Sequence, residues 1–329
     1  MQFHRPKRRS FIALLASTAL ILLAPRATFG QTPGRTYRIG SLSVRPRTAP
    51  HFVAMLDELR RAGFIEGRNL VIADAGWGTR PERFVEAAAD LVHNKTDVIL
   101  AGGDAAIRAA QQATATIPIL AVADDMVGSG LVPSLAHQGG NTTGVSIVAS
   151  DLDAKRLEVL HDCVPLARRI AVLGDPTTVS TRAQVNAAGR ELGVEVIWFE
   201  ARNAEGIDRA LDGIVAARVE AVNVLASPIL NLARGQIIDW MRDAQLPAIY
   251  QWPETAELGG LLAYGPSQVA NYRDIVARQL IHLLRGARPA DLPIEQPIKF
   301  ELVINLKTAR TLGLDVPPKL IARADRVIE

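Results

Sequence analysis

Apolar and polar positions alternate with two different periods from about residue 37 onward. Short runs rich in β-branched residues, typical of strands, alternate with segments in which apolar residues recur every three to four positions, typical of amphipathic helices. The first series predicts strands at 37–44, 70–75, 97–101, 117–122 and 143–148, and helices at 50–62, 81–93 and 104–115. Because these strands are apolar almost throughout, we expect a parallel sheet covered by helices on both faces.

The same pattern then starts again. It predicts helices at 151–163, 179–192, 204–217 and 230–244, and strands at 169–173, 195–199, 221–225 and 247–250. A strand at 259–264, a long helix at 269–284, a proline-containing connector at 286–297 and a strand at 299–304 follow. Two βαβ series of similar length predict an α/β fold with two Rossmann-like lobes. The extra elements indicate a chain that crosses back to the first lobe and then returns.

The first thirty residues have the composition of a secretory signal peptide. A basic KRR head at 7–9 precedes an uncharged apolar run at 11–23 and a small-residue exit that ends at Gly30. The apolar run is short for a membrane span, so an uncleaved anchor is the weaker interpretation. The arginine pair of the head also fits a twin-arginine signal. We expect a signal peptide at 1–30 and a periplasmic mature protein that begins near Gln31, without a lipid anchor because no cysteine lies nearby.

Charge and cysteine content narrow the functional classes. Five of the 37 basic side chains lie in residues 1–30, which leaves 32 against 34 acidic ones and a net charge near −2 for the mature chain. It has no basic stripe and no basic cluster interleaved with aromatic residues, which disfavours nucleic acid as a partner. Cys163 is the single cysteine, so an internal disulfide is excluded. Its helical context favours a buried structural thiol over a catalytic one.

The candidate site lies in the loops that follow the strands, because ligands of open parallel sheets bind beyond the carboxyl ends of the strands. In the first lobe these loops contribute Ser43, Trp77, Asp104, Asp124 and Asp125. In the second lobe they contribute Asp175, Thr177, Ser227, Gln251 and Trp252. Helices start directly after several of these loops, and their free N–H groups could receive a carboxylate or another small anion.

The most distinctive of these residues also have purely structural interpretations. Asp104 follows a glycine pair, where it would either cap a helix or compete with an anionic ligand and so favour an amine or a hydroxyl. Asp124 and Asp125 could together bind an ammonium group, or could shape a turn. Trp77 and Trp252 could hold a flat ligand between the lobes, or could pack beneath the loops.

Signals for catalysis are weak. The chain has no Gly-x-Ser-x-Gly elbow, no Walker loop and no His-Glu-x-x-His motif, and the spacing of its acidic residues and histidines does not match a metal site. His51 follows the first strand-end loop and is the one histidine that fits a site, although a lone histidine there is more often a surface residue. We therefore predict a protein that is not an enzyme and holds no cofactor and no metal.

Several longer motifs resemble those of a known family. They are LRRAGFIEGRN at 59–69, RPER at 80–83, VGSGLV at 127–132, GGNTTG at 139–144, KFELVINLKTA at 299–309, and PP at 317–318 followed by ARAD at 322–325. On these motifs, essentially the whole mature chain resembles the ABC-transporter substrate-binding proteins of the type I periplasmic-binding superfamily, in the subfamily with tryptophan- and tyrosine-binding members. Asp125 matches an acidic position of that family, whereas Asp104-Ala105 and Asp175-Pro176 replace its usual Thr/Ser-Pro and Asn-Pro.

The resemblance implies a domain organisation and a function. Lobe one would comprise 31–147 plus 264–294 and lobe two 148–263 plus 295–329, joined by a three-stranded hinge near 145–150, 262–266 and 294–298. A monomer would close on one small molecule, an aromatic amino acid or a related amine-bearing metabolite, and deliver it to the membrane subunits of an ABC permease. A ligand-sensing module for a receptor and an exported hydrolase are the alternatives. The export signal disfavours a cytosolic repressor.

Overall fold

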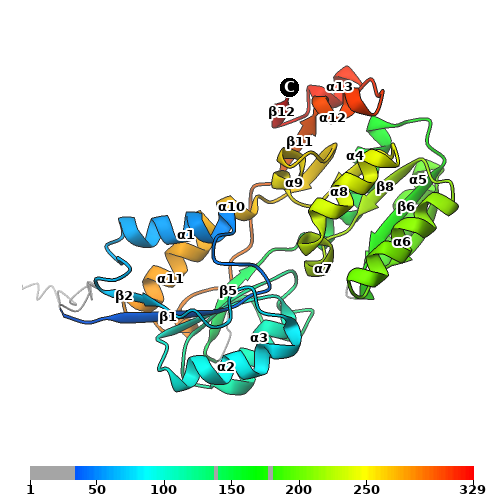
Figure 1. The fold of residues 1–329 in the computed structure, drawn as a ribbon. Coiled ribbons are helices and arrows are strands. Elements are labelled where there is room, and N and C mark those ends of the chain that lie inside the picture. Colours follow the sequence, from blue (N-terminus) through cyan, green and yellow to red (C-terminus); the bar gives the residue numbers. More distant parts are fainter. Residues whose placement is uncertain (1–33, 137–139, 177–180) are drawn as a thin grey trace, which may run out of the picture.

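The computed structural model describes residues 34–136, 140–176 and 181–329, which form two α/β lobes (Figure 1). The predicted signal peptide and Thr177 lie outside the described residues. The first lobe is built on a five-stranded sheet and the second on a seven-stranded sheet. The two βαβ series of the sequence therefore correspond to two separate sheets, as predicted.

The first sheet has the strand order β2-β1-β3-β4-β5, and all neighbouring strands run parallel. Its strands are β1 (Tyr37–Leu42), β2 (Leu70–Ile72), β3 (Val98–Gly102), β4 (Ile119–Ala123) and β5 (Thr142–Ser146). The helices of this series are α1 (Pro50–Arg61), the 3₁₀ turn η1 (Pro81–Arg83), α2 (Phe84–His93) and α3 (Asp104–Ala113). One buried cluster lies on each face of the sheet, which is why the strands are apolar almost throughout.

The second sheet has the order β12-β11-β10-β9-β8-β6-β7. Its strands are β6 (Arg169–Gly174), β7 (Glu195–Glu200), β8 (Ala221–Val224), β9 (Ala248–Tyr250), β10 (Leu262–Gly265), β11 (Glu301–Asn305) and β12 (Arg326–Ile328). Its helices are η2 (Ser150–Leu152), α4 (Asp153–Cys163), α5 (Arg182–Leu192), α6 (Ala204–Ala216), α7 (Pro228–Leu232), α8 (Arg234–Asp243), α9 (Pro253–Glu257), α12 (Leu306–Thr311) and α13 (Pro318–Ile321). The sheet is parallel except that β10 and β11 pair antiparallel, because the chain leaves and re-enters the lobe between them.

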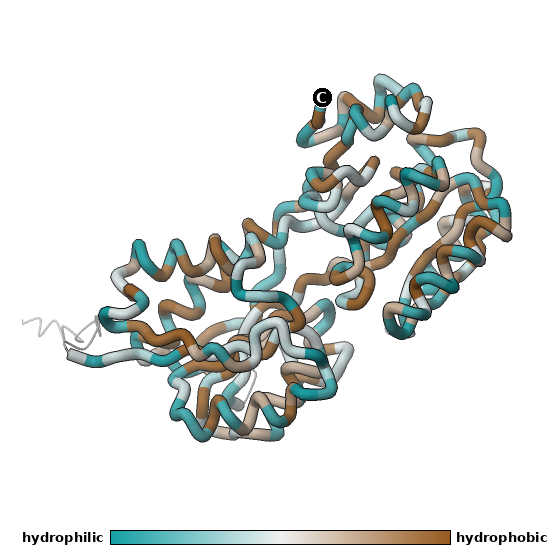
Figure 2. The backbone as a smooth tube through the Cα atoms, viewed as in Figure 1, coloured by the Kyte–Doolittle hydropathy of each residue, from teal (hydrophilic) through white to brown (hydrophobic). Residues whose placement is uncertain are grey.

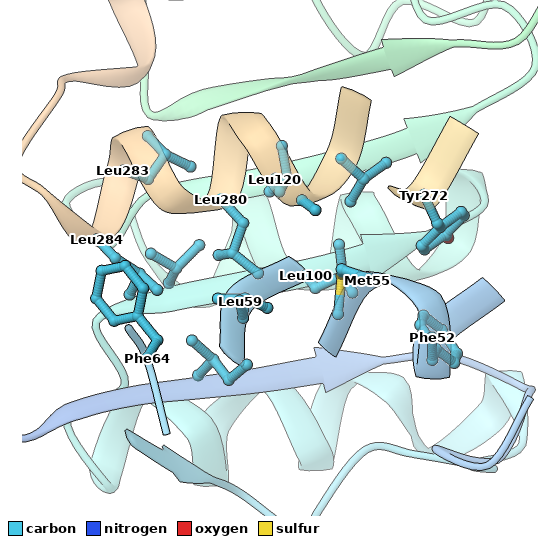
Figure 3. Close-up of a cluster of buried hydrophobic side chains, with 14 of the residues drawn as sticks. Phe52, Met55, Leu59, Phe64, Leu100, Leu120, Tyr272, Leu280, Leu283 and Leu284 are labelled. Atoms are coloured by element: carbon cyan, nitrogen blue, oxygen red, sulfur yellow. The ribbon is translucent and has the colours of Figure 1, made fainter. Parts of the chain in front are cut away.

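Between β10 and β11 the chain returns to the first lobe. It forms α10 (Gln268–Asn271), the π-helical turn η4 (Tyr272–Val276), α11 (Ala277–Leu284) and η5 (Pro289–Asp291). Figure 3 shows α11 beside α1 over the sheet, with Leu280 of α11 and Leu59 of α1 in one buried cluster with Leu100 of β3. Burial of each such leucine contributes about 1.5–3 kcal/mol. A segment that is distant in the sequence therefore completes the first lobe.

The helix predicted at 230–244 is instead two helices. Ser227 caps α7 by accepting a hydrogen bond from the Leu230 N–H at 3.3 Å, and Pro228 starts it. Ala233 then leaves helical geometry, with φ −87° and ψ 8°. Arg234 consequently lies in the first turn of α8 rather than in a helix interior.

Hydropathy follows this architecture. Hydrophobic residues concentrate along the strands, and hydrophilic ones on the outer turns of the helices (Figure 2). Among the described residues, every helix is too short or too polar to serve as a membrane span.

Candidate ligand-binding site

The chain passes between the two sheets three times: after β5, after β10 and before β11 (Figure 1). The fully buried side chain of Arg156, in α4, joins the first two crossovers. It donates to the carbonyl oxygen of Ala149 at 2.7 Å and to that of Tyr264 at 3.0 Å. It also forms an ion pair with the buried Asp153 carboxylate. One guanidinium therefore ties two crossovers to the same helix.

Asp124, a predicted ligand residue directly after β4, is hydrogen-bonded to the first crossover. Its carboxylate accepts hydrogen bonds from the backbone N–H of Ala149 at 2.7 Å and from the backbone N–H and hydroxyl of Ser150. The third crossover is attached to β5, the strand that precedes the first crossover, since Glu295 forms a bridge with Val145 of β5. The Asp124 carboxylate therefore holds the first crossover in place.

At the edge of the first lobe, Ser43 and Trp77 pair in a parallel bridge just beyond β1. Ser43 Oγ accepts a hydrogen bond from the Arg45 N–H at 3.0 Å, and Trp77 Nε1 donates to the Ala73 carbonyl at 2.9 Å. The indole of Trp77 stands edge-on to the ring of Phe52, with centroids 4.6 Å apart. The Trp77 ring thus packs onto the core and remains partly exposed at the edge.

Asp104 does not cap α3. The cap is Gly103, at φ +86°, and Asp104 is the first helical residue, with an exposed side chain. The capping interpretation is therefore wrong, because a glycine that reaches positive φ freely starts the helix one residue earlier than expected. The Asp104 charge instead lies at the positive end of the helix dipole, where it is favourable.

Asp125 lies in a turn beside two other carboxylates. It accepts hydrogen bonds from the backbone N–H groups of Val127 at 3.2 Å and Gly128 at 2.8 Å, as the turn interpretation predicts. Burial, and then the negative charges of Asp124 and Asp125, raise the pKa of Asp151. The described residues contain no group of three or more histidine, cysteine or acidic side chains arranged to hold a metal ion. The carboxylates thus form a local region of negative charge.

At the edge of the second lobe, the predicted residues are more deeply buried. Ser227 Oγ donates a hydrogen bond to the Asp175 carboxylate, and both residues are buried. Gln251 and Trp252 follow β9 and are only 2% and 7% exposed. Within the described part of the chain, the Trp252 Nε1–H has no hydrogen-bond partner. A buried indole N–H normally has one, so this donor is available to a group that the protein does not supply.

Charged residues from both lobes meet near His51 of α1. This side chain is 6% exposed and its ring lies 4.6 Å from that of Tyr272, so the expected surface position is wrong. Burial, and then the charges of Arg45 and Arg234, lower the pKa of His51 to about 3. Arg234 begins α8 of the second lobe, whereas Arg45 and His51 belong to the first. The strand-end edge of one lobe therefore lies close enough to the other for charges to interact.

A separate cavity of about 460 Å³ lies along β7 and α6. Trp198, Glu200, Arg202 and Arg209 are among the residues that line it. Strand β7 is the outermost strand of the seven-stranded sheet. Because the cavity contains none of the predicted site residues, it is distinct from the candidate site.

Comparison with known proteins identifies the family. The family model described as ABC transporter substrate binding protein matches residues 52–328. The chain belongs to this family of substrate-binding proteins. Members bind a small-molecule ligand and work with an ABC permease, and such binding proteins are not enzymes.

Relatives of this substrate-binding protein share its fold at low sequence identity. The Tyrosine-binding protein of Clostridioides difficile (strain R20291) is 24% identical over 261 residues, which cover 78% of this chain and 74% of the relative. A conserved domain protein from Vibrio cholerae O1 biovar El Tor superposes with a TM-score of 0.79 at 23% identity, covering 89% and 99% of the two chains. The ABC domain from Streptococcus pneumoniae in complex with L-Trp gives a TM-score of 0.74 at 20% identity, covering 89% and 100%. Both structures have the two-lobed α/β architecture described above.

Sequence reasoning missed two arginines of this substrate-binding protein that lie at the facing edges. Arg45 lies between the strand predicted at 37–44 and the helix predicted at 50–62, so its position was available from the sequence although its environment was not. Arg234 fell inside the helix predicted at 230–244, although Gly235, directly after it, is a possible sign of a break. A second signal was the Ser227-Pro228 start, which predicts a helix beginning earlier than 230.

Proposed function

We propose that this protein is exported to the periplasm, captures one small molecule between its two lobes and delivers it to an ABC permease. The observation that carries the proposal is that the strand-end edges of two α/β lobes approach each other beside crossovers joined by Arg156. Ligands of such sheets bind at these edges. The names of two relatives, one tyrosine-binding and one in complex with L-Trp, support an aromatic amino acid or a related amine-bearing metabolite as the ligand.

The proposed protein is a monomer that begins near Gln31, after a signal peptide at 1–30. Its first lobe comprises 31–147 plus 264–294, and its second 148–263 plus 295–329. The lobes close about the three crossovers as hinges. Closure is a population shift, because a ligand stabilises the closed form when both lobes contact it.

Within the proposed site, the aromatic rings would hold the flat part of the ligand and the carboxylates would hold its amine. Trp77 is partly exposed at the first edge, and Trp252 offers an unpartnered N–H at the second. Asp125 adds its charge to that of Asp124. Ser43, Asp104, Asp175, Thr177, Ser227 and Gln251 complete the proposed polar lining.

Thermal-shift screening of the purified protein against amino acids, amines and other small metabolites tests the function. A ligand that binds only the folded state raises the melting temperature. At a ligand concentration of a hundred times the dissociation constant, it adds about 2.7 kcal/mol to the free energy of unfolding. A melting temperature that no compound in the panel changes would count against capture of a small molecule.

Two conservative variants then test the site. Trp252→Phe keeps an aromatic ring and removes the unpartnered N–H, and Asp125→Asn keeps the turn acceptor and removes the charge. Each should weaken binding of the ligand found in the screen by about tenfold, as expected when one hydrogen bond to a charged group is lost. Asp243→Asn, on the exposed end of α8, is the control. Unchanged affinity in both variants, measured by calorimetry, removes these residues from the site.

A further inference from the structure

Arg45 occupies a fixed position in the loop after β1. Its backbone N–H donates to Ser43 Oγ at 3.0 Å, and its carbonyl oxygen accepts from the Gly78 N–H at 2.9 Å. The side chain is half-buried, and its Nε is sealed from solvent without a hydrogen-bond partner among the described residues. Arg47, two residues later, forms an ion pair with Glu66. Of these two arginines, Arg47 therefore has an acid partner, whereas Arg45 has none among the described residues.

Arg234 is the counterpart on the second lobe. It is the first residue of α8, is half-buried, and donates to the carbonyl oxygen of Asn231 in the preceding turn at 2.9 Å. In the described part of the chain, neither Arg45 nor Arg234 has a carboxylate within the 4.0 Å of an ion pair. The Glu254 charge favours the Arg234 cation, but the two side chains do not form an ion pair.

The Arg234 charge also acts on Arg45. Burial, and then the positive charge of Arg234, lower the pKa of Arg45 to about 10. Burial likewise lowers the pKa of Arg234, and the Glu254 charge opposes this. The same two positive charges help to keep His51 neutral. Partly desolvated like charges without a counter-ion destabilise the folded state. Such an arrangement is expected where a bound anion compensates the charge.

The Glu254 side chain does not supply that compensation. Its Oε1 accepts hydrogen bonds from Ser267 Oγ at 2.6 Å and from the Val269 N–H at 3.0 Å, at the start of α10. Its carboxylate is therefore held by the second crossover and not by Arg234. Its Oε2 is buried and has no partner in the described residues, so an ammonium group could lie on that side.

We propose that Arg45 and Arg234 bind a carboxylate of the ligand, one from each lobe, so that the anion bridges the edges when the lobes close. Guanidinium groups match a carboxylate in geometry and form charge-assisted hydrogen bonds with it. Because each lobe contributes one cation, the anion interacts with both only in the closed form, which favours closure. This proposal rests on the proposed function and adds a carboxylate to its amine-bearing ligand.

Matched acids and primary amides provide the test. The probes are L-tyrosine, L-tryptophan and L-phenylalanine, with the corresponding amides and the decarboxylated amines, measured by thermal shift and calorimetry. The proteins are wild type, Arg45→Met and Arg234→Met. The control is Arg285→Met, which removes another half-buried arginine whose Nε has no partner among the described residues, but which follows α11 away from the facing edges.

We expect at least one acid to bind wild type 10- to 100-fold more tightly than its amide. Arg45→Met and Arg234→Met should each bind that acid no better than the amide, whereas Arg285→Met should keep the wild-type preference for the acid. Without ligand, Arg45→Met should melt at or above the wild-type temperature, because the substitution removes a repulsion. A merely structural role for Arg45 would instead lower that temperature.

Three outcomes overturn the proposal. In the first, an amide or amine binds wild type as tightly as its acid. In the second, Arg45→Met and Arg234→Met keep the preference for the acid. In the third, no acid in the panel stabilises wild type. A neutral or cationic compound that stabilises wild type and both variants equally would refute the carboxylate site and leave the proposed capture function standing. If no compound of any charge binds, both proposals fail.

Discussion

The arginine at the crossovers and the arginines at the facing edges differ in whether an acid is paired with them. At the crossovers, Arg156 is fully buried with Asp153 and two backbone carbonyls as partners. At the edges, Arg45 and Arg234 are half-buried without an ion-pair partner in the described residues. A paired buried charge gives a fixed geometry, whereas unpaired charges keep a capacity to bind. The difference separates the part of the molecule that must hold its shape from the part that we infer receives a ligand.

The largest expected effect is at Arg156. Arg156→Met leaves the Asp153 carboxylate buried without its cation, so the free energy of unfolding should fall by about 3–5 kcal/mol. Urea unfolding followed by tryptophan fluorescence measures this loss.

The double variant Asp153→Leu, Arg156→Met removes both charges and should recover part of the lost stability. Arg209→Met, which breaks an exposed pair with Glu205, should leave the transition unchanged. An Arg156→Met protein as stable as wild type would contradict the assignment of Arg156 to the framework.

The next effect is an acid sensitivity at the facing edges. The pKa of His51 is about 3 in the folded protein, whereas an unperturbed histidine has a pKa of 6.5, so the unfolded chain binds more protons between these values. Stability should therefore fall as the pH falls through this window, by about 2 kcal/mol between pH 7 and pH 5. His51→Asn should remove that dependence, and His93→Asn, at the end of α2 and more exposed, should not.

Arg45 and Arg234, the arginines of the facing edges, contribute to this acid sensitivity. Because their charges contribute to the lowered pKa of His51, Arg45→Met and Arg234→Met should each raise that pKa toward its ordinary value. The loss of stability should then end at a higher pH than in wild type, whereas the loss between pH 7 and pH 5 should stay nearly the same, because the pKa of the unfolded chain sets it. Titration of the His51 ring by NMR in each variant measures the shift. An unchanged pKa in both variants would mean that burial alone keeps His51 neutral.

The smallest effect concerns strain in the first crossover. Val148 has φ +48°, a left-handed conformation that is unfavourable for a β-branched residue. Val148→Gly should therefore raise the free energy of unfolding by about 0.5–1 kcal/mol, after the entropy cost of glycine. Val127→Gly, at an exposed valine of ordinary φ, should lower it instead. A decrease in both variants would show that the crossover stores no strain at Val148.

Most of the fold could be predicted from the sequence, because strand and helix periods differ and each element buries one kind of face. The helix at 50–62 and the strand at 169–173 were predicted within one residue of α1 and β6. An error arose at Ala233 between α7 and α8, because the single glycine nearby, Gly235, is also compatible with a continuous helix. The return of α11 to the first lobe was indicated only by the extra helix and strands predicted after the second βαβ series.

The candidate site was less predictable, because a strand-end position does not reveal which atoms the backbone already uses. Asp124 serves the first crossover and Ser227 caps α7, although both lie where a ligand residue was expected. The Arg45 side chain lies in a predicted loop, but its lack of an acid partner depends on residues that only the fold brings near. The electrostatic effect of Arg234 on Arg45 depends on the relative position of two lobes, which no local pattern encodes.

The position of α11 has a consequence for how the protein is made. The core over the first sheet includes Tyr272, Leu280 and Leu284, so residues 37–146 leave the ribosome long before their covering helix is synthesised. Strands β6 to β9 of the second sheet follow one another in the chain and are neighbours in the sheet, so they can assemble without waiting. The lobe that emerges first therefore waits for its covering helix until most of the second lobe has been synthesised, and the apolar surface of α1 must be shielded in the meantime.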